Sequence, residues 1–276
     1  MSSDIDDLEG ATSDARAMQK YLEQTLGIAS KHIKMLLDQE ATRAAILDSI
    51  CAMKQNPGIN PGDSILIFYA GYGTVAKAPG SWDIDSALIQ LLAPHDILSK
   101  VDGRMINGIP DRTIGALLEE LSVVKGDNIT VVLDCCYNYF PTRDDTNKVN
   151  SRRSVRCFEM PQDVQLPSDL DQDIWQGHQG LHTSPGFLKS GLSSHVLLTA
   201  CGPMESAQEH NGRGYFTRAL LDTFSTFGVH EATYTGIIRR LPCLPGQTHS
   251  AKALIISAFA SMPWPQSASA SCILYD

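Results

Sequence analysis

Four short segments of this chain are apolar at nearly every position, and this feature constrains the fold most. The segments are 64–69, 129–133, 195–200 and 253–257. Runs that are apolar on every residue suit strands buried on both faces. Between them, apolar residues recur at the spacing of helices. Strands that alternate with helices predict an α/β fold, a three-layer α/β/α sandwich with a mainly parallel central sheet.

The predicted helices are marked by apolar residues three and four positions apart. Ser13 or Asp14 is the expected N-cap of the first helix, and Gly27 is its expected stop. The four stripes are Met18, Leu22 and Leu26; Ala45, Ile46, Ile50 and Met53; Ile114, Leu117, Leu118 and Leu121; and Phe216, Leu220, Leu221 and Phe224.

Charge and composition exclude several classes of function. The chain has 31 acidic against 22 basic residues and a formal net charge of −9, which disfavours binding to nucleic acid. No apolar run approaches the about 20 residues of a membrane span, and the acidic first residues resemble no leader peptide. Seven cysteines without framework spacing indicate a reducing compartment, the cytoplasm or the nucleus. No zinc-binding pattern occurs, so no metal or other cofactor is expected.

One stretch, 141–194, breaks the alternation of strands and helices. It is rich in Ser, Asp, Gln, Gly and Pro, and it contains several arginines. We expect one domain over 1–276, in which 141–194 forms a long mobile linker loop between the parts 1–140 and 195–276. Exposed basic residues in such a loop are good targets for proteases.

Two predicted strand ends carry chemically distinctive residues. Gly71–Gly73 follows one strand, and Asp134–Cys136 ends another. The carboxyl ends of parallel strands meet at one edge of a sheet, so a thiol and backbone N–H donors can come together there. That arrangement suits a cysteine nucleophile with an oxyanion hole. The alternative is a pair of thiols buried in the core.

A nucleotide site is a weaker possibility. Gly71–Ala76 formally matches the G-x-G-x-x-A fingerprint of dinucleotide-binding proteins. That motif needs a helix to begin at the glycines, and residues 77–81 contain a proline and a glycine that disfavour one.

At these residues the chain resembles the caspase/metacaspase family, specifically the caspase-domain proteins of fungi. The stretch Asp63–Gly73 is similar to the family's "D-S-L-x-F-x-Y-S-G-H-G" strand, and Ile129–Cys136 is similar to "I-x-x-I-x-D-x-C". Further similar stretches are 8–15, 37–46, 194–201 and 214–221. The resemblance implies a caspase-like fold, with 1–140 like the large subunit and 195–276 like the small one. It also implies that the first strand of that fold is missing.

Carried over residue by residue, the resemblance implies a role for each site residue. Cys136 takes the place of the nucleophile, and the N–H groups of Gly73 and Cys136 fall at the oxyanion hole. Asp111 and Asp134 match acidic residues that line a pocket for Arg or Lys, and paired carboxylates bind a guanidinium well. For Asp111, a helix cap before Arg112 is an equal alternative.

The departures from the family pattern concern the catalytic base and the residues near it. Tyr72 stands where the family has its catalytic His, Ala70 where Ser is frequent, and Tyr137 where a second His often follows the nucleophile. A tyrosine has a pKa near 10, stays neutral at pH 7 and is a poor base. The substitution predicts a pseudo-peptidase or a very slow peptidase.

Other residues leave the prediction open on two points. His95, His178 or His182 could supply a replacement base. Calcium activation, known in some metacaspases, is implied only in part, because Arg112 follows Asp111 where a second acid is expected.

Three hypotheses follow. The first is an impaired peptidase domain that binds basic peptides or proteins, or that regulates an active caspase-like relative. The resemblance relates such a domain to proteins of programmed cell death. The second is an active Arg/Lys-specific cysteine endopeptidase that cuts itself after Arg152, Arg153 or Arg156. The third is a nucleotide-binding α/β protein.

Overall fold

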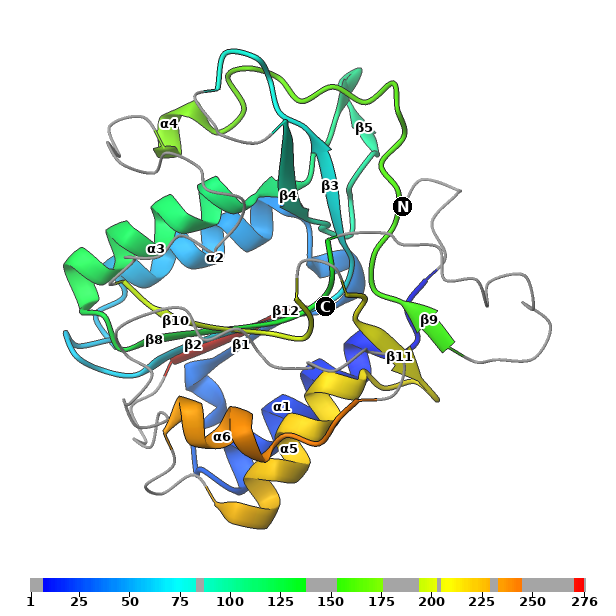
Figure 1. Ribbon diagram of the computed structural model, residues 1–276. Coiled ribbons are helices and arrows are strands. Elements are labelled where there is room, and N and C mark those ends of the chain that lie inside the picture. The colour runs from blue at the N-terminus through cyan, green and yellow to red at the C-terminus, as the bar shows by residue number, and fades with distance from the viewer. Residues whose placement is uncertain are drawn as a thin grey trace.

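The central feature of the computed structural model is a parallel sheet of five strands (Figure 1). The structure describes residues 7–82, 87–137, 153–175, 194–202, 205–228, 233–244 and 271–275. The order of strands across the sheet is β1 (Ile33–Leu36), β12 (Ser271–Tyr275), β2 (Ile65–Ala70), β8 (Ile129–Asp134) and β10 (Val196–Thr199). Each neighbouring pair is parallel, which confirms the predicted fold class.

Helices cover both faces of this sheet (Figure 1). One face is covered by α1 (Ala11–Gln24), α5 (Tyr215–Phe227) and α6 (Tyr234–Arg240), and the other by α2 (Arg43–Gln55) and α3 (Asp111–Lys125). The apolar stripes of the sequence face the sheet in each layer, and they form a separate hydrophobic core on each side.

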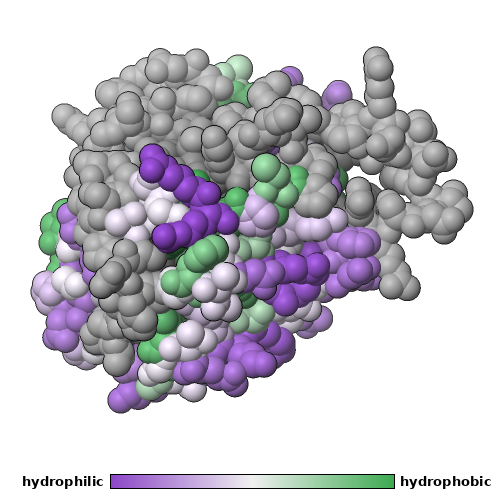
Figure 2. All heavy atoms as spheres, turned by 60° about the horizontal axis from the view of Figure 1, so that its bottom comes forward, coloured by the Kyte–Doolittle hydropathy of each residue, from purple (hydrophilic) through white to green (hydrophobic). Residues whose placement is uncertain are grey.

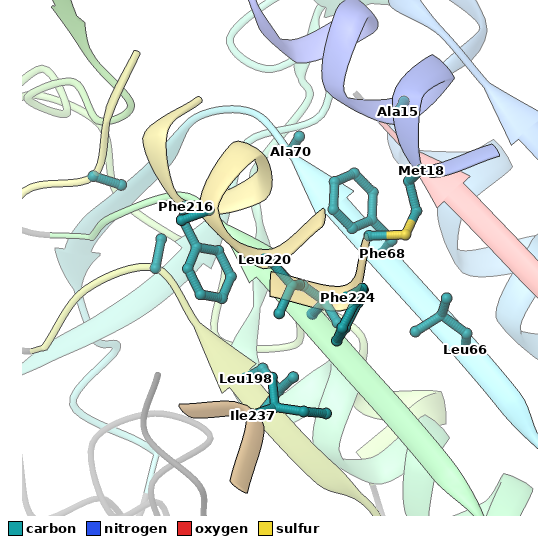
Figure 3. Packing of buried hydrophobic residues seen from close by; sticks show 14 of the residues in the cluster. Ala15, Met18, Leu66, Phe68, Ala70, Leu198, Phe216, Leu220, Phe224 and Ile237 are labelled. Carbon is teal, nitrogen blue, oxygen red and sulfur yellow. The ribbon is translucent and has the colours of Figure 1, made fainter. Parts of the chain in front are cut away.

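The core between the sheet and α1, α5 and α6 is built from large apolar side chains (Figure 3). Met18 of α1, Phe68 of β2 and Phe224 of α5 lie together, and Leu198 of β10 lies toward α6. Each of these side chains is almost completely buried. Burial of one such side chain contributes about 1.5–3 kcal/mol, so this layer holds α1 and α5 firmly against the strands.

Three of the four predicted strands are present. The runs 64–69, 129–133 and 195–200 correspond to β2, β8 and β10, and every residue of β2 and β8 is buried. The run 253–257 lies outside the described residues. The strand β12 was not predicted, and it pairs with both β1 and β2. The first strand of the caspase-like fold was expected to be missing. Because β12 lies between β1 and β2, the sheet is continuous at this place.

Smaller elements complete the described part of the fold. They are the three-stranded antiparallel sheet of β3 (Gly73–Lys77), β4 (Leu88–Leu92) and β7 (Ile109–Pro110), the pairs β5 (Lys100–Val101) with β6 (Arg104–Met105) and β9 (Arg153–Val155) with β11 (Gln208–His210), and the short helices η1 (Ser30–His32), η2 (Asp38–Glu40) and α4 (Gln172–Trp175). The glycines of the formal dinucleotide fingerprint lead into β3, so no helix N-terminus stands there for a pyrophosphate.

Part of the expected linker, residues 153–175, is built into the molecule. Residues 153–155 pair with β11, and Phe158 and Met160 join a small core around Trp82. The carboxylate of Asp171 forms an ion pair of 2.5 Å with Arg43. The local sequence shows neither the period of a helix nor that of a strand. The segment takes its structure from partners that are distant in the chain, so the sequence pattern did not reveal it.

Two observations describe the outside of the molecule. In the face shown in Figure 2, which brings the lower helices of Figure 1 forward, hydrophilic residues predominate and hydrophobic ones form small separate groups. Among the described residues, no helix has both the length and the apolar character of a membrane span.

The buried His195 predicts acid-sensitive stability. It is 2% exposed at the start of β10, and burial lowers its pKa to about 4. Between pH 6.5 and 4 the unfolded chain binds a proton that the folded chain does not, so stability falls as the pH falls. Between pH 7 and pH 5, we expect the free energy of unfolding of His195→Asn to fall by about 2 kcal/mol less than that of the wild type, as measured by urea denaturation. Equal losses in the two proteins would contradict this assignment.

Candidate active site

The ends of β2 and β8 bring Gly73 and Cys136 together. Ala70 lies opposite Asp134 in the register of these strands, and the chain continues from both toward the same edge. Gly73 packs so closely on Cys136 that a Cβ at residue 73 would overlap the carbonyl oxygen of Cys136. Only glycine fits at this position without moving the chain around the thiol.

Two backbone N–H groups at this edge point to one carbonyl oxygen. The N–H groups of Gly73 and Cys136 both donate to the oxygen of Arg156, each over 3.1 Å. Two convergent N–H donors are the arrangement of an oxyanion hole. The carbonyl that they hold belongs to the peptide bond between Arg156 and Cys157.

The segment around this bond lies as an extended peptide against the rest of the chain. Before the bond, β9 pairs antiparallel with β11, and the N–H of Arg156 donates to Ala207 over 2.9 Å. After the bond, Cys157 forms a β-bridge with Gly73, and Thr74 Oγ1 donates to the carbonyl of Phe158 over 2.8 Å. Addition of a strand to an exposed edge is a common mode of peptide recognition.

The guanidinium of Arg156 lies completely buried among three carboxylates. It pairs with Asp14 at 2.6 Å, with Asp134 at 3.1 Å and with Glu209 at 3.2 Å. Burial opposes the charge on Arg156, but the charges of Asp134, Asp14 and Glu209 outweigh it and raise the pKa of Arg156 above its usual value. The group therefore remains a cation inside the protein.

The fold positions these carboxylates at the start of α5. Asp134 ends β8 and accepts the N–H of Thr217, in the first turn of α5, over 3.0 Å. Asp14 accepts the N–H of Gly214, which precedes that helix, over 2.7 Å. A helix N-terminus favours negative charge, so α5 stabilises both groups. A Cβ at Gly214 would come within 2.5 Å of Asp134 Oδ2, so the site also requires a glycine here.

Two members of this cluster were missed in the sequence. The sequence predicted Ser13 or Asp14 as the N-cap of the first helix, but α1 begins at Ala11 after the N-cap Gly10. The Asp14 side chain instead pairs with Arg156 and Arg213. Burial raises the pKa of Asp14, although the charge of Arg156 opposes this. Glu209 lies in β11, where no sequence pattern distinguished it, and it also accepts the N–H of Gly10.

Asp111 stands apart from this cluster. It is the first helical residue of α3, after the N-cap Pro110, and its Oδ1 accepts the N–H of Arg112 over 2.6 Å. Asp111 is therefore not the N-cap of this helix, although its carboxylate lies at the helix N-terminus. The carboxylates that form ion pairs with the Arg156 guanidinium are those of Asp14, Asp134 and Glu209. Of the two acids that the resemblance implied, the structure therefore brings Asp134 to the arginine and leaves Asp111 at its helix.

The thiol of Cys136 is buried and lies next to Ala207, which also contacts Arg156. Its Sγ is 3.9 Å from the carbonyl oxygen of Ala207, the group that also holds the N–H of Arg156. Burial, with hydrogen bonds to the thiols of Cys157 and Cys201, raises the pKa of Cys136 well above its usual value. At neutral pH Cys136 is therefore a protonated thiol.

Tyr72 contacts the part of this segment that follows the peptide bond. Its ring meets Phe158 edge-on, with ring centroids 5.8 Å apart, so residue 72 is close to the part of the segment that follows Arg156. Tyr72 and Phe158 line a cavity of about 590 Å³ that His95 also lines. Positions 72 and 95 thus face the same cavity as Phe158. His178 and His182 lie outside the described residues.

The described ranges contain no group of three or more His, Cys, Asp or Glu side chains that could hold a metal ion. At the place where the resemblance suggested a second acid, the Arg112 guanidinium lies between two indole rings. It is 4.5 Å from the ring centroid of Trp82 and 3.6 Å from that of Trp175. Position 112 thus serves the packing of α3 against α4.

Two plant metacaspases match about half of this chain. The chain is 26% identical over 136 residues to metacaspase-7 and 27% identical over 141 residues to metacaspase-6, both of Arabidopsis thaliana. Each match covers 48% of this chain, and it covers 31% and 34% of the two relatives. The chain thus spans about a third of the length of these metacaspases.

A solved structure supports the fold over nearly the whole chain. The crystal structure of protein GSU0716 from Geobacter sulfurreducens matches with a TM-score of 0.57 at 19% identity, covering 94% of this chain and 89% of that one. The sequence model of the Peptidase C14 family, described as the caspase domain, matches residues 3–273. The chain therefore belongs to the caspase-domain family.

Proposed function

We propose that this chain is a cysteine endopeptidase domain that recognises arginine, that its site is filled by its own residues 153–158, and that Tyr72 impairs its catalysis. One observation carries the proposal. The carbonyl of Arg156 accepts the N–H groups of Gly73 and Cys136, while its guanidinium is buried among three carboxylates. Backbone, reacting carbonyl and side chain are thus all held as a substrate would be held.

The charge of the pocket favours arginine over lysine. Asp14, Asp134 and Glu209 approach the guanidinium from several directions, and Glu209 meets both the Nε and one terminal nitrogen. A planar guanidinium satisfies such a set with its several fixed N–H donors, whereas an ammonium offers one point charge. The domain would therefore bind basic peptides or proteins mainly through an arginine.

The impairment follows from the groups at the bond. The Cys136 thiol is buried and protonated, and position 72 supplies a phenol, which is a poor base. Loss of the base from a catalytic dyad typically costs several powers of ten in rate. A regulatory or binding role, in which the site exchanges its own segment for a basic partner or for an active caspase-like relative, fits these groups better than rapid turnover. We place that role in the cytoplasm or the nucleus, where thiols stay reduced.

The alternative of an active enzyme that cuts itself has one specific observation in its favour. Of the three arginines considered, Arg156 has its carbonyl at the two N–H donors. Arg153 lies three residues earlier in β9, opposite His210, and Arg152 lies outside the described residues. Self-cleavage, where it occurs, is expected after Arg156.

Chemical rescue tests the arginine pocket. We expect Arg156→Ala to lower the free energy of unfolding by about 3–5 kcal/mol, because the change leaves buried carboxylates without their cation. Agmatine, which carries a guanidinium on a short chain, should raise the melting temperature of this variant and leave that of the wild type unchanged. Pentylamine, with an ammonium in its place, should do so much less. No gain with agmatine at any concentration would contradict the pocket, and Arg156→Lys serves as a variant that keeps a cation there.

Restoring the base tests the assignment of position 72. We expect Tyr72→His to increase cleavage at Arg156, followed as the 1–156 and 157–276 fragments by intact mass, by about 100-fold or more. Tyr72→Phe is the matched control and should give no increase. A folded Tyr72→His protein without any gain would contradict the assignment. Rapid cleavage of the wild type that disappears in Cys136→Ala would instead establish the active alternative.

A further inference from the structure

The peptide bond held at the N–H pair is flanked by two thiols. Cys136 contributes one of the two N–H donors, and Cys157 supplies the nitrogen of the bond itself. The Cys136 and Cys157 thiols are hydrogen-bonded to each other, and their residues are 0% and 4% exposed. A polarised carbonyl with a thiol on either side is a site where an acyl group can move between nitrogen and sulfur.

Both halves of the chain stay anchored if this bond opens. The acyl half is held by the ion pairs of Arg156 and by the pairing of β9 with β11. The amine half is held by the bridge of Cys157 with Gly73 and by the bonds of Phe158 to Gly73 and Thr74. The new amine would remain beside the carbonyl, and such juxtaposition corresponds to effective concentrations of about 10⁵–10⁸ M.

We propose that the Arg156–Cys157 bond is a site of reversible acyl transfer, at which Cys136 takes the Arg156 acyl group as a thioester and Cys157 takes it back. This inference rests on the assignment of Cys136 as the nucleophile in the proposed function. It adds that resealing, rather than hydrolysis, is the main fate of the acyl group.

The step balances without any further reactant. The sulfur of Cys136 bonds to the carbonyl carbon of Arg156, the carbon–nitrogen bond breaks, and the thiol proton passes to the nitrogen of Cys157. In the return direction the Cys157 thiol displaces Cys136 from the thioester, and its own amine then takes the acyl group through a five-membered ring. The proton returns to the sulfur of Cys136, and the original peptide bond is restored.

The surroundings favour return over hydrolysis. Hydrolysis of a thioester at neutral pH needs a base to activate water, and residue 72 supplies a phenol. The amine and thiol of Cys157 stay in place through backbone bonds, whereas a water molecule has to enter a buried site. The chain therefore remains intact at equilibrium unless a stronger external nucleophile intercepts the thioester.

Hydroxylamine is such a nucleophile, and it makes the transfer visible. We expect the full chain, incubated with neutral hydroxylamine, to accumulate fragment 1–156 ending in a hydroxamate, together with fragment 157–276. Buffer alone should give less than a tenth of this cleavage, measured by intact mass. The fragment masses distinguish this reaction from hydroxylamine cleavage at Asn107–Gly108 and Asn211–Gly212.

Two variants complete the test. Cys136→Ala should abolish the hydroxamate. Cys157→Ser, a near-isosteric change, should raise the share of fragment ending in a free carboxylate several-fold, because a hydroxyl captures thioesters poorly. Three results would overturn the inference: no hydroxamate in the folded wild type, equal cleavage in buffer, or a hydroxamate that persists in Cys136→Ala. If agmatine still stabilises Arg156→Ala in that event, the proposed function stands without the acyl transfer; if it does not, both fail.

Discussion

The ion pairs of Arg156 are the interaction on which the rest of the site depends. This side chain joins α1 through Asp14, β8 through Asp134 and β11 through Glu209. Because it is completely buried, each carboxylate is held in place by it and would be an uncompensated charge without it. The same side chain aligns the carbonyl of Arg156 with the N–H groups of Gly73 and Cys136. The geometry that suggests catalysis and the packing that stabilises this edge of the sheet therefore share one residue.

Because Arg156 has both roles, the site is occupied by the chain's own residues 153–158. On the proposed function, a peptide from another protein would have to displace residues 153–158, which are tethered to the chain and thus present at a high effective concentration. In the proposed function, the buried Cys136 thiol and the phenol of Tyr72 lower the reactivity of the bond that is held there. Occupancy of the pocket and slow chemistry would then act in the same direction, since a segment that is cut slowly or resealed would continue to fill the pocket.

The sequence was sufficient for those parts of the fold where burial is uniform along a strand. Every residue of β2 and β8 is buried, so their apolar runs predicted both strands, and the rule that parallel strands end at one edge brought Gly73 to Cys136. The strand β9 could not be predicted in this way, because two of its three residues are polar and its partner β11 is distant in the chain. The strand β12 contains a short apolar run, Cys272–Tyr275, of the kind that predicted β2 and β8, and it was missed.

In the acidic pocket, too, the sequence predicted one part and not the rest. Asp134 was found because it adjoins the predicted nucleophile. Asp14 was predicted, as an alternative to Ser13, to cap a helix, since a polar residue near the start of an apolar stripe normally does so. Glu209 had no local signal at all. A pocket built from a helix, a strand end and an edge strand is a property of tertiary structure. Residue types alone indicate that a basic group is bound, but not which carboxylates bind it.

The most direct test of this account is a double-mutant cycle between Arg156 and Asp134, using Arg156→Met and Asp134→Asn and the free energy of unfolding in urea. If the ion pair organises the site, each single change leaves a buried group without its partner, and the double variant should be more stable than the sum of the single losses by about 2 kcal/mol or more. Losses that simply add would show that the two residues act independently, and would contradict the account.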